Sequence, residues 1–203
     1  VIMLHFIGDF DKHKRNDALA NMKSLLSVIG ELGGLGAVTP AAYGLHSRHL
    51  PPFDPPRSDA ETQTILHDAL NQVGNHAKAN GVHVLLEPLN RYEDYMLNTL
   101  EQGVAMCRTL NHPSVKLMGD LFHMSIEEQD MGKSIIAAKD HLAHIHVADS
   151  NRFEPGQAHT DFANPLKALK SIGFKGSLAY ECRLKSDAAD TLPRSTAYLK
   201  GFM

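Results

Sequence analysis

The feature that most constrains the fold is an alternation of short apolar segments with longer segments of helical periodicity. The short segments are apolar at nearly every position, which is typical of strands buried on both faces. We predict such strands at 1–8, 34–40, 82–87, 115–120, 142–149 and 176–181. Strands of this kind that alternate with helices favour a parallel sheet covered by helices. The predicted fold class is therefore α/β.

The segments between the strands carry helix signals. Capping-box patterns at 58–61 and 99–102 predict two helix starts. Asn164, followed by proline, predicts a third start, and a last helix is expected over 191–202. The proline-rich segment 49–59 is too polar for the core, so we interpret it as a loop that could close over an active site.

The number of strands suggests an incomplete barrel. Six strand-helix units are predicted, whereas a closed (β/α)8 barrel needs eight units and usually about 250 residues. The chain has 203 residues and no internal linker, so we expect one domain over 1–203. The first predicted strand begins at residue 1. Either the sheet is open or two units are missing at the N-terminus. We favour the second alternative and expect a TIM barrel whose first two units are absent from this sequence, the six visible units being the third to the eighth.

Charge and cysteine content exclude several classes of partner. The formal net charge is -3, from 20 basic and 23 acidic residues without a basic run, so neither nucleic acid nor an anionic membrane is an expected partner. Only Cys107 and Cys182 are present, too few for a disulfide framework. The apolar start, 1–10, is too short for a membrane span and lacks the flanks of a signal peptide. We expect a cytoplasmic protein that binds a small molecule.

Four polar residues stand at or near the carboxyl ends of successive predicted strands: Glu87, Asp120, His146 and Glu181. In a parallel barrel these strand ends form the face where active sites are built, so the four side chains should converge. Three converging carboxylates repel one another unless a cation lies between them. Carboxylates and one imidazole, without cysteine, suit Mn²⁺, Mg²⁺ or Co²⁺ better than a tetrahedral zinc site, although Zn²⁺ also binds such ligands.

Other polar residues near the strand ends have simpler interpretations. His144 lies deeper than His146 on the same strand face and is expected to be a core histidine. Cys182 should point away from Glu181, so a catalytic thiol is not expected. Asp149 and Glu154 are expected to cap or solvate their loop, and the run 125–130 is expected to be solvated and to start a helix. His159 and Asp161 could border the site, or they could make loop hydrogen bonds.

Several motifs together resemble a known family. They are "EPLNRYE" at 87–93, "DLFHMSIEE" at 120–128, "HIHVADSNR" at 144–152 and the strand-end Glu181. In this order and spacing the chain resembles the xylose isomerase-like TIM-barrel sugar isomerases and epimerases, and most of all the ketose 3-epimerases for D-tagatose, D-psicose and L-ribulose. The resemblance covers about 1–203.

The resemblance implies a site and a reaction. Its metal ligands fall on Glu87, Asp120, His146 and Glu181, with Mn²⁺ as the usual metal and Co²⁺ or Mg²⁺ as substitutes. Its substrate-binding residues fall on Glu93, His123 and Arg152. The implied reaction is C3 epimerisation of a ketose through an ene-diolate, with Glu87 and Glu181 as the acid-base pair. Relatives form dimers and tetramers, so a homo-oligomer is expected.

The residues leave alternatives open. An aldose-ketose isomerase, a hydroxypyruvate isomerase or an inosose dehydratase could use the same ligands. An endonuclease IV-like enzyme would need more histidine ligands and a basic face. A non-catalytic sugar-binding barrel would be expected to have a damaged ligand set. Within the 87–93 motif, Asn90 and Arg91 are expected to brace the loop.

Overall fold

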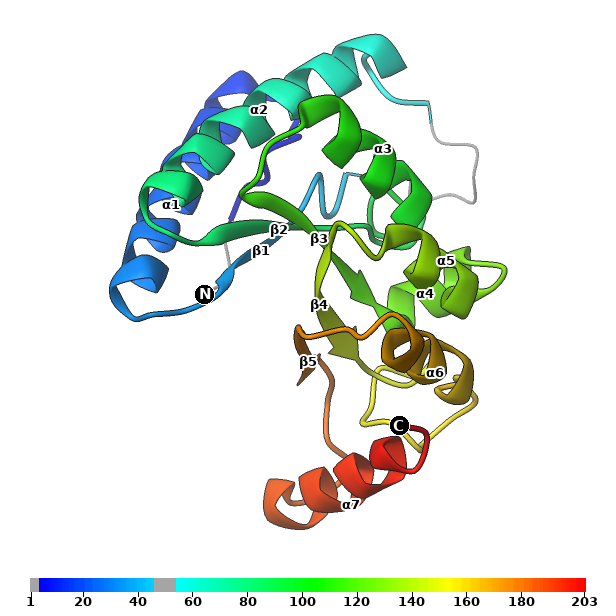
Figure 1. The fold of residues 1–203 in the computed structure, drawn as a ribbon. Coiled ribbons are helices and arrows are strands. Elements are labelled where there is room, and N and C mark those ends of the chain that lie inside the picture. The colour runs from blue at the N-terminus through cyan, green and yellow to red at the C-terminus, as the bar shows by residue number, and fades with distance from the viewer. Residues whose placement is uncertain (1–3, 46–53) are drawn as a thin grey trace.

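The computed structural model describes residues 4–45 and 54–203, and its centre is one parallel sheet (Figure 1). Its strands follow the order of the chain: β1 (Gly36–Pro40), β2 (His83–Glu87), β3 (Val115–Asp120), β4 (Leu142–Val147) and β5 (Ser177–Tyr180). The helices are α1 (Lys12–Glu31), α2 (Asp59–Ala79), α3 (Leu100–Leu110), α4 (Leu121–Glu127), α5 (Met131–Ala138), α6 (Ala163–Ser171) and α7 (Ala188–Lys200). The predicted α/β class and the strand-helix alternation are confirmed.

The sheet curves as part of a barrel wall would, with the helices on its outer side (Figure 1). Apolar side chains of the strands and of the facing helices form one core, which includes Leu26 of α1, Leu70 of α2, Leu86 of β2 and Leu117 of β3, each fully buried. The central strands β2 and β3 are buried at nearly every position, whereas β5 is only partly buried. Among the described residues, no helix is both long enough and apolar enough to cross a membrane.

The helix starts agree with the sequence signals at two of three places. Ser58 and Thr99 each form a full capping box, with Glu61 and Gln102 respectively. The start predicted with Asn164 as the N-cap is two residues late, because Phe162 is the N-cap and α6 begins at Ala163. Asp161 Oδ1 accepts hydrogen bonds from the backbone of Ala163 and Asn164, so Asp161 supplies the cap.

The last predicted helix also differs at its start. Helix α7 begins at Ala188, three residues before the predicted range 191–202. The side chain of Asp187 accepts a hydrogen bond from the backbone N–H of Ala189 and so starts the helix.

The first predicted strand is not formed where the structure describes it. Residues 1–3 of this prediction lie outside the described residues, and residues 4–8 form bends and turns. The backbone N–H of Asp9 bonds Phe6 O, which closes a turn, while Ile7 is fully buried. Leu4, by contrast, is 86% exposed, so within 4–8 the apolar residues neither pair as a strand nor are all buried. Of the predicted loop 49–59, residues 49–53 likewise lie outside the described part.

The strand register brings the carboxyl ends of the strands to one edge of the sheet. Asp120 pairs with His146 across β3 and β4. Glu181 follows β5 directly, and its N–H bonds Val147 O at the end of β4. Glu87 ends β2 beside Pro40 of β1. All four predicted strand-end residues thus lie on the same edge.

Candidate metal centre

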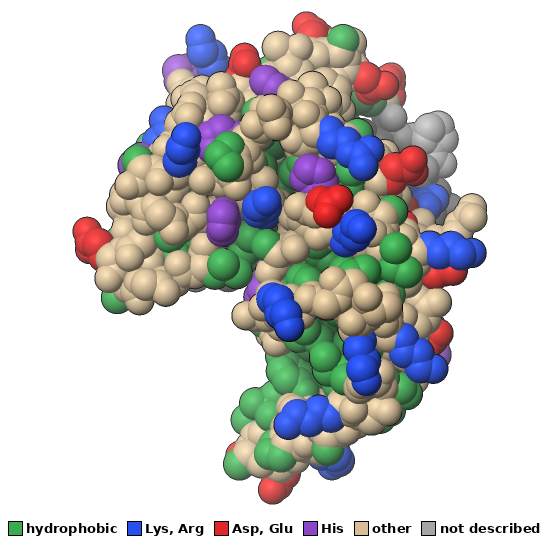
Figure 2. All heavy atoms as spheres, viewed as in Figure 1, with side chains coloured by type: hydrophobic (Ala, Val, Ile, Leu, Met, Phe, Trp, Pro, Cys, Tyr) green, Lys and Arg blue, Asp and Glu red, His purple; other side chains and the backbone are tan. Residues whose placement is uncertain are grey.

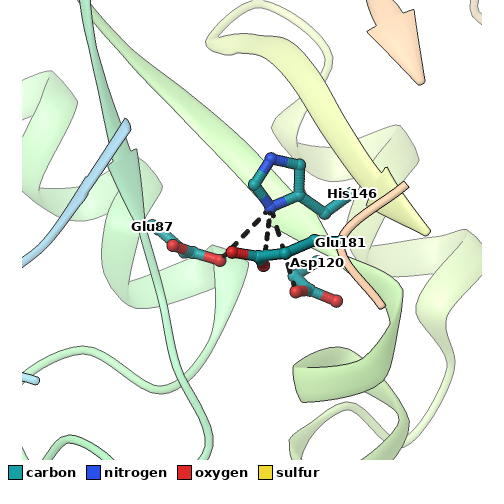
Figure 3. A group of neighbouring side chains, drawn as sticks. All are labelled: Glu87, Asp120, His146 and Glu181. Carbon is teal, nitrogen blue, oxygen red and sulfur yellow. Dashed lines mark hydrogen bonds and ion pairs between the residues drawn. The ribbon is translucent and has the colours of Figure 1, made fainter. Parts of the chain in front are cut away.

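Glu87, Asp120, His146 and Glu181 point toward one another at this edge (Figure 3). Each offers one ligand atom, and the four atoms lie within 4.8 Å of one another. His146 Nδ1 lies 3.0 Å from Glu181 Oε2, 3.8 Å from Glu87 Oε1 and 4.0 Å from Asp120 Oδ2. The expected convergence of the four side chains is therefore present.

The carboxylates of this cluster lie in very different surroundings. Asp120 is fully buried and Glu87 is 5% exposed, whereas the Glu181 side chain is 49% exposed. Burial, together with the nearby charges of Asp120 and Glu181, raises the pKa of Glu87 well above its ordinary value. Glu87 Oε1 is buried without a hydrogen bond from any described residue. A buried carboxylate oxygen without a partner is costly, and a cation at this place would satisfy it.

Arg152 bonds two of the carboxylates of this cluster. Its Nη1 donates to Asp120 Oδ2 at 2.7 Å, and its Nη2 donates to Glu181 Oε2 at 2.6 Å. The guanidinium lies over the ring of Phe122, 4.5 Å from the centroid. Arg152 has a φ of 60°, which a non-glycine residue rarely adopts, so the surrounding loop must hold it there.

These contacts shift the pKa values of two further carboxylates. Burial raises the pKa of Asp120, against the opposing charges of Arg152 and His123. Burial would also raise the pKa of Glu181, but the hydrogen bond and charge of His146 and the charge of Arg152 outweigh it and lower this pKa to about 2. Glu87 and Glu181 are thus pushed in opposite directions, an arrangement that is common in acid-base pairs.

The donor set fits a divalent cation that prefers oxygen ligands. Three carboxylates and one imidazole nitrogen converge, without a thiolate, and Glu87 Oε1 lacks another partner. Hard cations such as Mn²⁺ and Mg²⁺ favour this set. The residues that could hold the ion are those four.

A pocket of about 460 Å³ opens beside the cluster. Three of the four cluster residues line it, as do Glu93, His123 and Arg152, the residues expected to bind substrate. Its remaining walls are largely apolar and include Phe6, Val38, Tyr43 and Leu89. A pocket with a few convergent polar groups among apolar ones is the usual form of a small-molecule site.

Comparison with known families decides what kind of barrel this is. Residues 2–202 match the family described as xylose isomerase-like TIM barrel. The chain belongs to this family. The five-stranded sheet is accordingly part of a TIM-barrel-type fold, as the sequence predicts.

Within the xylose isomerase-like family, several of the matching relatives are sugar epimerases. A 3-dehydro-D-guloside 4-epimerase from Escherichia coli is 35% identical over 196 residues, which cover 96% of this chain and 75% of the relative. A D-psicose 3-epimerase from Ruminiclostridium cellulolyticum is 39% identical over 114 residues, 56% of this chain but only 39% of the relative. The crystal structure of a 3-keto-D-glucoside 4-epimerase from E. coli superimposes with a TM-score of 0.91 at 34% identity, covering 97% of this chain and 75% of that one.

Three further polar residues near the strand ends make contacts that the structure describes. Asp149 accepts five backbone hydrogen bonds and holds the loop that carries Arg152; the donors are the N–H groups of Ser150, Gly156, Gln157, Ala158 and Thr160. His144 is half-buried and its ring contacts that of His146 edge-on, 4.9 Å between centroids. His159 makes a loop hydrogen bond with Ser150.

The acidic run 125–130 is more than a solvated surface. Glu127 accepts a two-pronged hydrogen bond from the Arg91 guanidinium, and Glu128 accepts from the N–H of Leu100 and the hydroxyl of Ser134. Only Asp130 acts as the expected helix start, because it caps α5. The run therefore ties the loop after β2 to the segment after β3, and the expectation that Arg91 braces its loop is confirmed by this contact.

Proposed function

We propose that this chain is a divalent-metal-dependent sugar epimerase that inverts the carbon next to a ketone, with C3 epimerisation of a ketose as the first candidate reaction. The observation that carries the proposal is the meeting of Glu87, Asp120, His146 and Glu181 beside a pocket lined by Glu93, His123 and Arg152. The similarity to sugar epimerases supports the same reaction class.

The proposed acid-base pair is Glu87 and Glu181. Inversion requires that a proton leaves one face of the carbon and that another arrives on the opposite face, so two groups on separate strands are needed. Glu87 ends β2 and Glu181 follows β5, with β3 and β4 between them. One carboxylate takes the proton and the other returns a proton, and the two exchange roles when the reaction runs in reverse.

A cation held by the four ligands would supply positive charge that stabilises the ene-diolate oxygens. We propose Mn²⁺ as the ion, with Co²⁺ or Mg²⁺ as substitutes. His123 and Arg152 would hold substrate oxygens near the reacting carbon, and Glu93 would accept a hydrogen bond from a hydroxyl group. The apolar wall of Phe6, Val38 and Leu89 would limit water around the reacting carbon.

A second candidate has its own support. The E. coli 4-epimerase is 35% identical to this chain over 196 residues, and the E. coli 4-epimerase structure superimposes with a TM-score of 0.91. Epimerisation at C4 of a 3-keto-glycoside uses the same chemistry, because that carbon also lies next to a ketone. The ligand set suits both reactions equally, so the substrate must be decided by assay.

An endonuclease on this scaffold is less well supported. The cluster contains one histidine among three carboxylates. On the face shown in Figure 2, Lys and Arg side chains stand in separate groups spread over several elements. Nucleic-acid enzymes concentrate basic residues where the phosphate backbone binds.

The deciding experiment is solvent deuterium exchange. The chelated protein and the Mn²⁺-loaded protein would be incubated in D2O with free ketoses and with a methyl 3-keto-glucoside. We expect deuterium at the inverted carbon, C3 of the ketose or C4 of the glycoside, only with metal. Aldose products would indicate an aldose-ketose isomerase, and the absence of exchange from every substrate would refute the proposal.

A further inference from the structure

Asn90, in the loop after β2, connects two residues that line the pocket. Its side chain is almost fully buried at 1% exposure. Nδ2 donates to Glu93 Oε1 at 3.0 Å and lies 2.7 Å from His123 Nδ1, while Oδ1 accepts from the N–H of Tyr92 at 3.0 Å. Both amide hydrogens and the carbonyl oxygen therefore have partners, which fixes the orientation of the amide.

The contacts of Asn90 also determine where the His123 ring carries its hydrogen. His123 Nδ1 faces the backbone N–H of Asn90 at 3.2 Å in addition to the side-chain Nδ2. A backbone N–H can only donate, so Nδ1 must present its lone pair. In a neutral ring the hydrogen is then on Nε2. Nε2 lies 3.8 Å from Asp120 Oδ2, at the metal-centre end of the ring.

We propose that Asn90 is a positioning residue that fixes His123 in its Nε2–H tautomer and holds Glu93 beside it. His123 then presents a hydrogen-bond donor to the pocket. Glu93 presents an acceptor, because its Oε1 is engaged by Asn90 and its Oε2 makes no hydrogen bond with a described residue. The tautomer follows from the contacts alone. Its use, to bind a ketone or hydroxyl oxygen of a sugar at His123 and a hydroxyl group at Glu93, rests on the proposed function.

The tautomer can be measured directly in the full chain. Long-range ¹H–¹⁵N correlation spectra of protein labelled with ¹⁵N-histidine distinguish a protonated ring nitrogen from an unprotonated one, and His123→Gln identifies the signals of this ring among the 13 histidines. We expect Nδ1 of His123 to be unprotonated and Nε2 to be protonated. A hydrogen on Nδ1 in the unsubstituted protein would overturn the proposal without any variant.

Two substitutions at Asn90 separate its contributions. Asn90→Asp has the same shape but places a carboxylate against Nδ1 of His123. The hydrogen bond from Nδ1–H to this charged acceptor should be stronger than the longer hydrogen bond from the backbone N–H. The hydrogen should therefore move to Nδ1. Asn90→Ala removes the side chain but leaves the backbone donor, so the hydrogen of the His123 ring should stay on Nε2. If Asn90→Asp does not fold, the unsubstituted protein still tests the proposal, because a hydrogen on Nδ1 of His123 would contradict the donor contacts of Asn90.

Asn98→Asp is the matched control in the same loop. The Asn98 side chain donates to the carbonyls of Leu89 and Asp94 and does not contact His123. This variant should keep the hydrogen on Nε2 even if the loop becomes less stable. A moved hydrogen in Asn98→Asp, or an unmoved one in a folded Asn90→Asp, would show that Asn90 does not set the tautomer.

Turnover of the sugar provides the second measurement. Loss of the Nε2–H donor should lower kcat of Asn90→Asp about 100-fold. Asn90→Ala only loosens Glu93 and the His123 ring, so its kcat should fall about 10-fold. Equal turnover in the two variants would contradict the tautomer's role. Absence of turnover in the unsubstituted protein would refute the proposed function and leave the NMR result unaffected.

Discussion

Arg152 Nη1 donates a hydrogen bond of 2.7 Å to Oδ2 of Asp120, a fully buried carboxylate that also lies 4.0 Å from His146 Nδ1. The same guanidinium bonds Glu181, so one positive charge is shared by two carboxylates of the candidate metal centre. A bound cation would act on the same oxygen atoms. Arg152 and a metal ion should therefore have overlapping effects on stability.

We predict that Arg152→Met destabilises the metal-free protein by about 2 kcal/mol, less than a fully buried pair because the Arg152 side chain is 30% exposed. Added Mn²⁺ should stabilise this variant more than the unsubstituted protein, since the cation replaces the missing charge. Urea unfolding with chelator and with Mn²⁺ measures both effects. Arg183→Met is the control, because it replaces an exposed arginine of the neighbouring segment. It should change neither the metal-free stability nor the stabilisation by Mn²⁺. Equal metal-free stabilities of Arg152→Met and the control would contradict the prediction.

Glu87→Gln should make the metal-free protein more stable. Burial and the charges of Asp120 and Glu181 raise the pKa of Glu87, so its folded form binds a proton more tightly than its unfolded form. This favourable contribution is present below the ordinary value of 4.5 and is lost as pH rises. At pH 8 the neutral amide should therefore increase the free energy of unfolding by about 1–2 kcal/mol.

The measurement for Glu87→Gln is urea unfolding at pH 4.5 and pH 8, without metal and with Mn²⁺. The difference in the free energy of unfolding between Glu87→Gln and the unsubstituted protein should increase from pH 4.5 to pH 8. Stabilisation of the variant by Mn²⁺ should be largely lost. A variant that is less stable than the parent at pH 8 would show that the Glu87 carboxylate is not strained in the metal-free state.

Glu181→Gln should remove catalysis and keep the fold. The side chain lies at the open end of the cluster, 49% exposed, so a neutral isostere disturbs little packing. Loss of one member of the acid-base pair should lower kcat about 10³-fold. Deuterium exchange measures the proton transfer, and circular dichroism with thermal unfolding checks the fold. Glu101→Gln on the exposed side of α3 should retain full exchange; comparable exchange in both variants would refute the role of Glu181.

The convergence of the four cluster residues could be predicted from sequence because it depends on two regular properties. Strands apolar on both faces indicate a parallel sheet, and a parallel sheet places its carboxyl ends on one edge. Glu87 and Asp120 end strands in the structure, and Glu181 follows one directly. The same reasoning failed for 4–8, where Ile7 is buried without strand pairing. An apolar pattern can indicate that a segment is buried. It does not show that the segment pairs as a strand, because pairing also requires a neighbouring strand.

The network around the cluster could not be predicted, because it depends on side chains that extend from loops. Arg152 bonds Asp120 from a loop position with a positive φ. Asn90, in the loop after β2, contacts His123 of α4, 33 positions away in the chain. Neither loop has a periodicity from which a side-chain direction could be inferred. The motif identified the residues, and the structure was needed to place them.

A substitution of Asp149 tests how the loop that carries Arg152 is held in place. Its Oδ1 and Oδ2 accept five backbone N–H groups, so Asp149→Asn, which turns an amide NH2 toward some of these donors, should destabilise the protein by about 3 kcal/mol. Burial would raise the pKa of Asp149, but the backbone donors, Thr160 and Ala158 foremost, outweigh it and lower this pKa. The stabilisation is therefore present above the ordinary value of 3.8 and is lost as pH falls through the lower, folded-state pKa.

Urea unfolding between pH 7 and pH 3 separates this contribution of Asp149 from general acid denaturation. The unsubstituted protein and Asp140→Asn, which replaces an exposed aspartate, should lose stability together as pH falls below about 4. Asp149→Asn should have a lower free energy of unfolding at pH 7. Its free energy of unfolding should fall less between pH 7 and pH 3, because its amide does not titrate. Parallel curves for all three proteins would mean that the Asp149 carboxylate does not hold the loop, and the position of Arg152 would then need another cause.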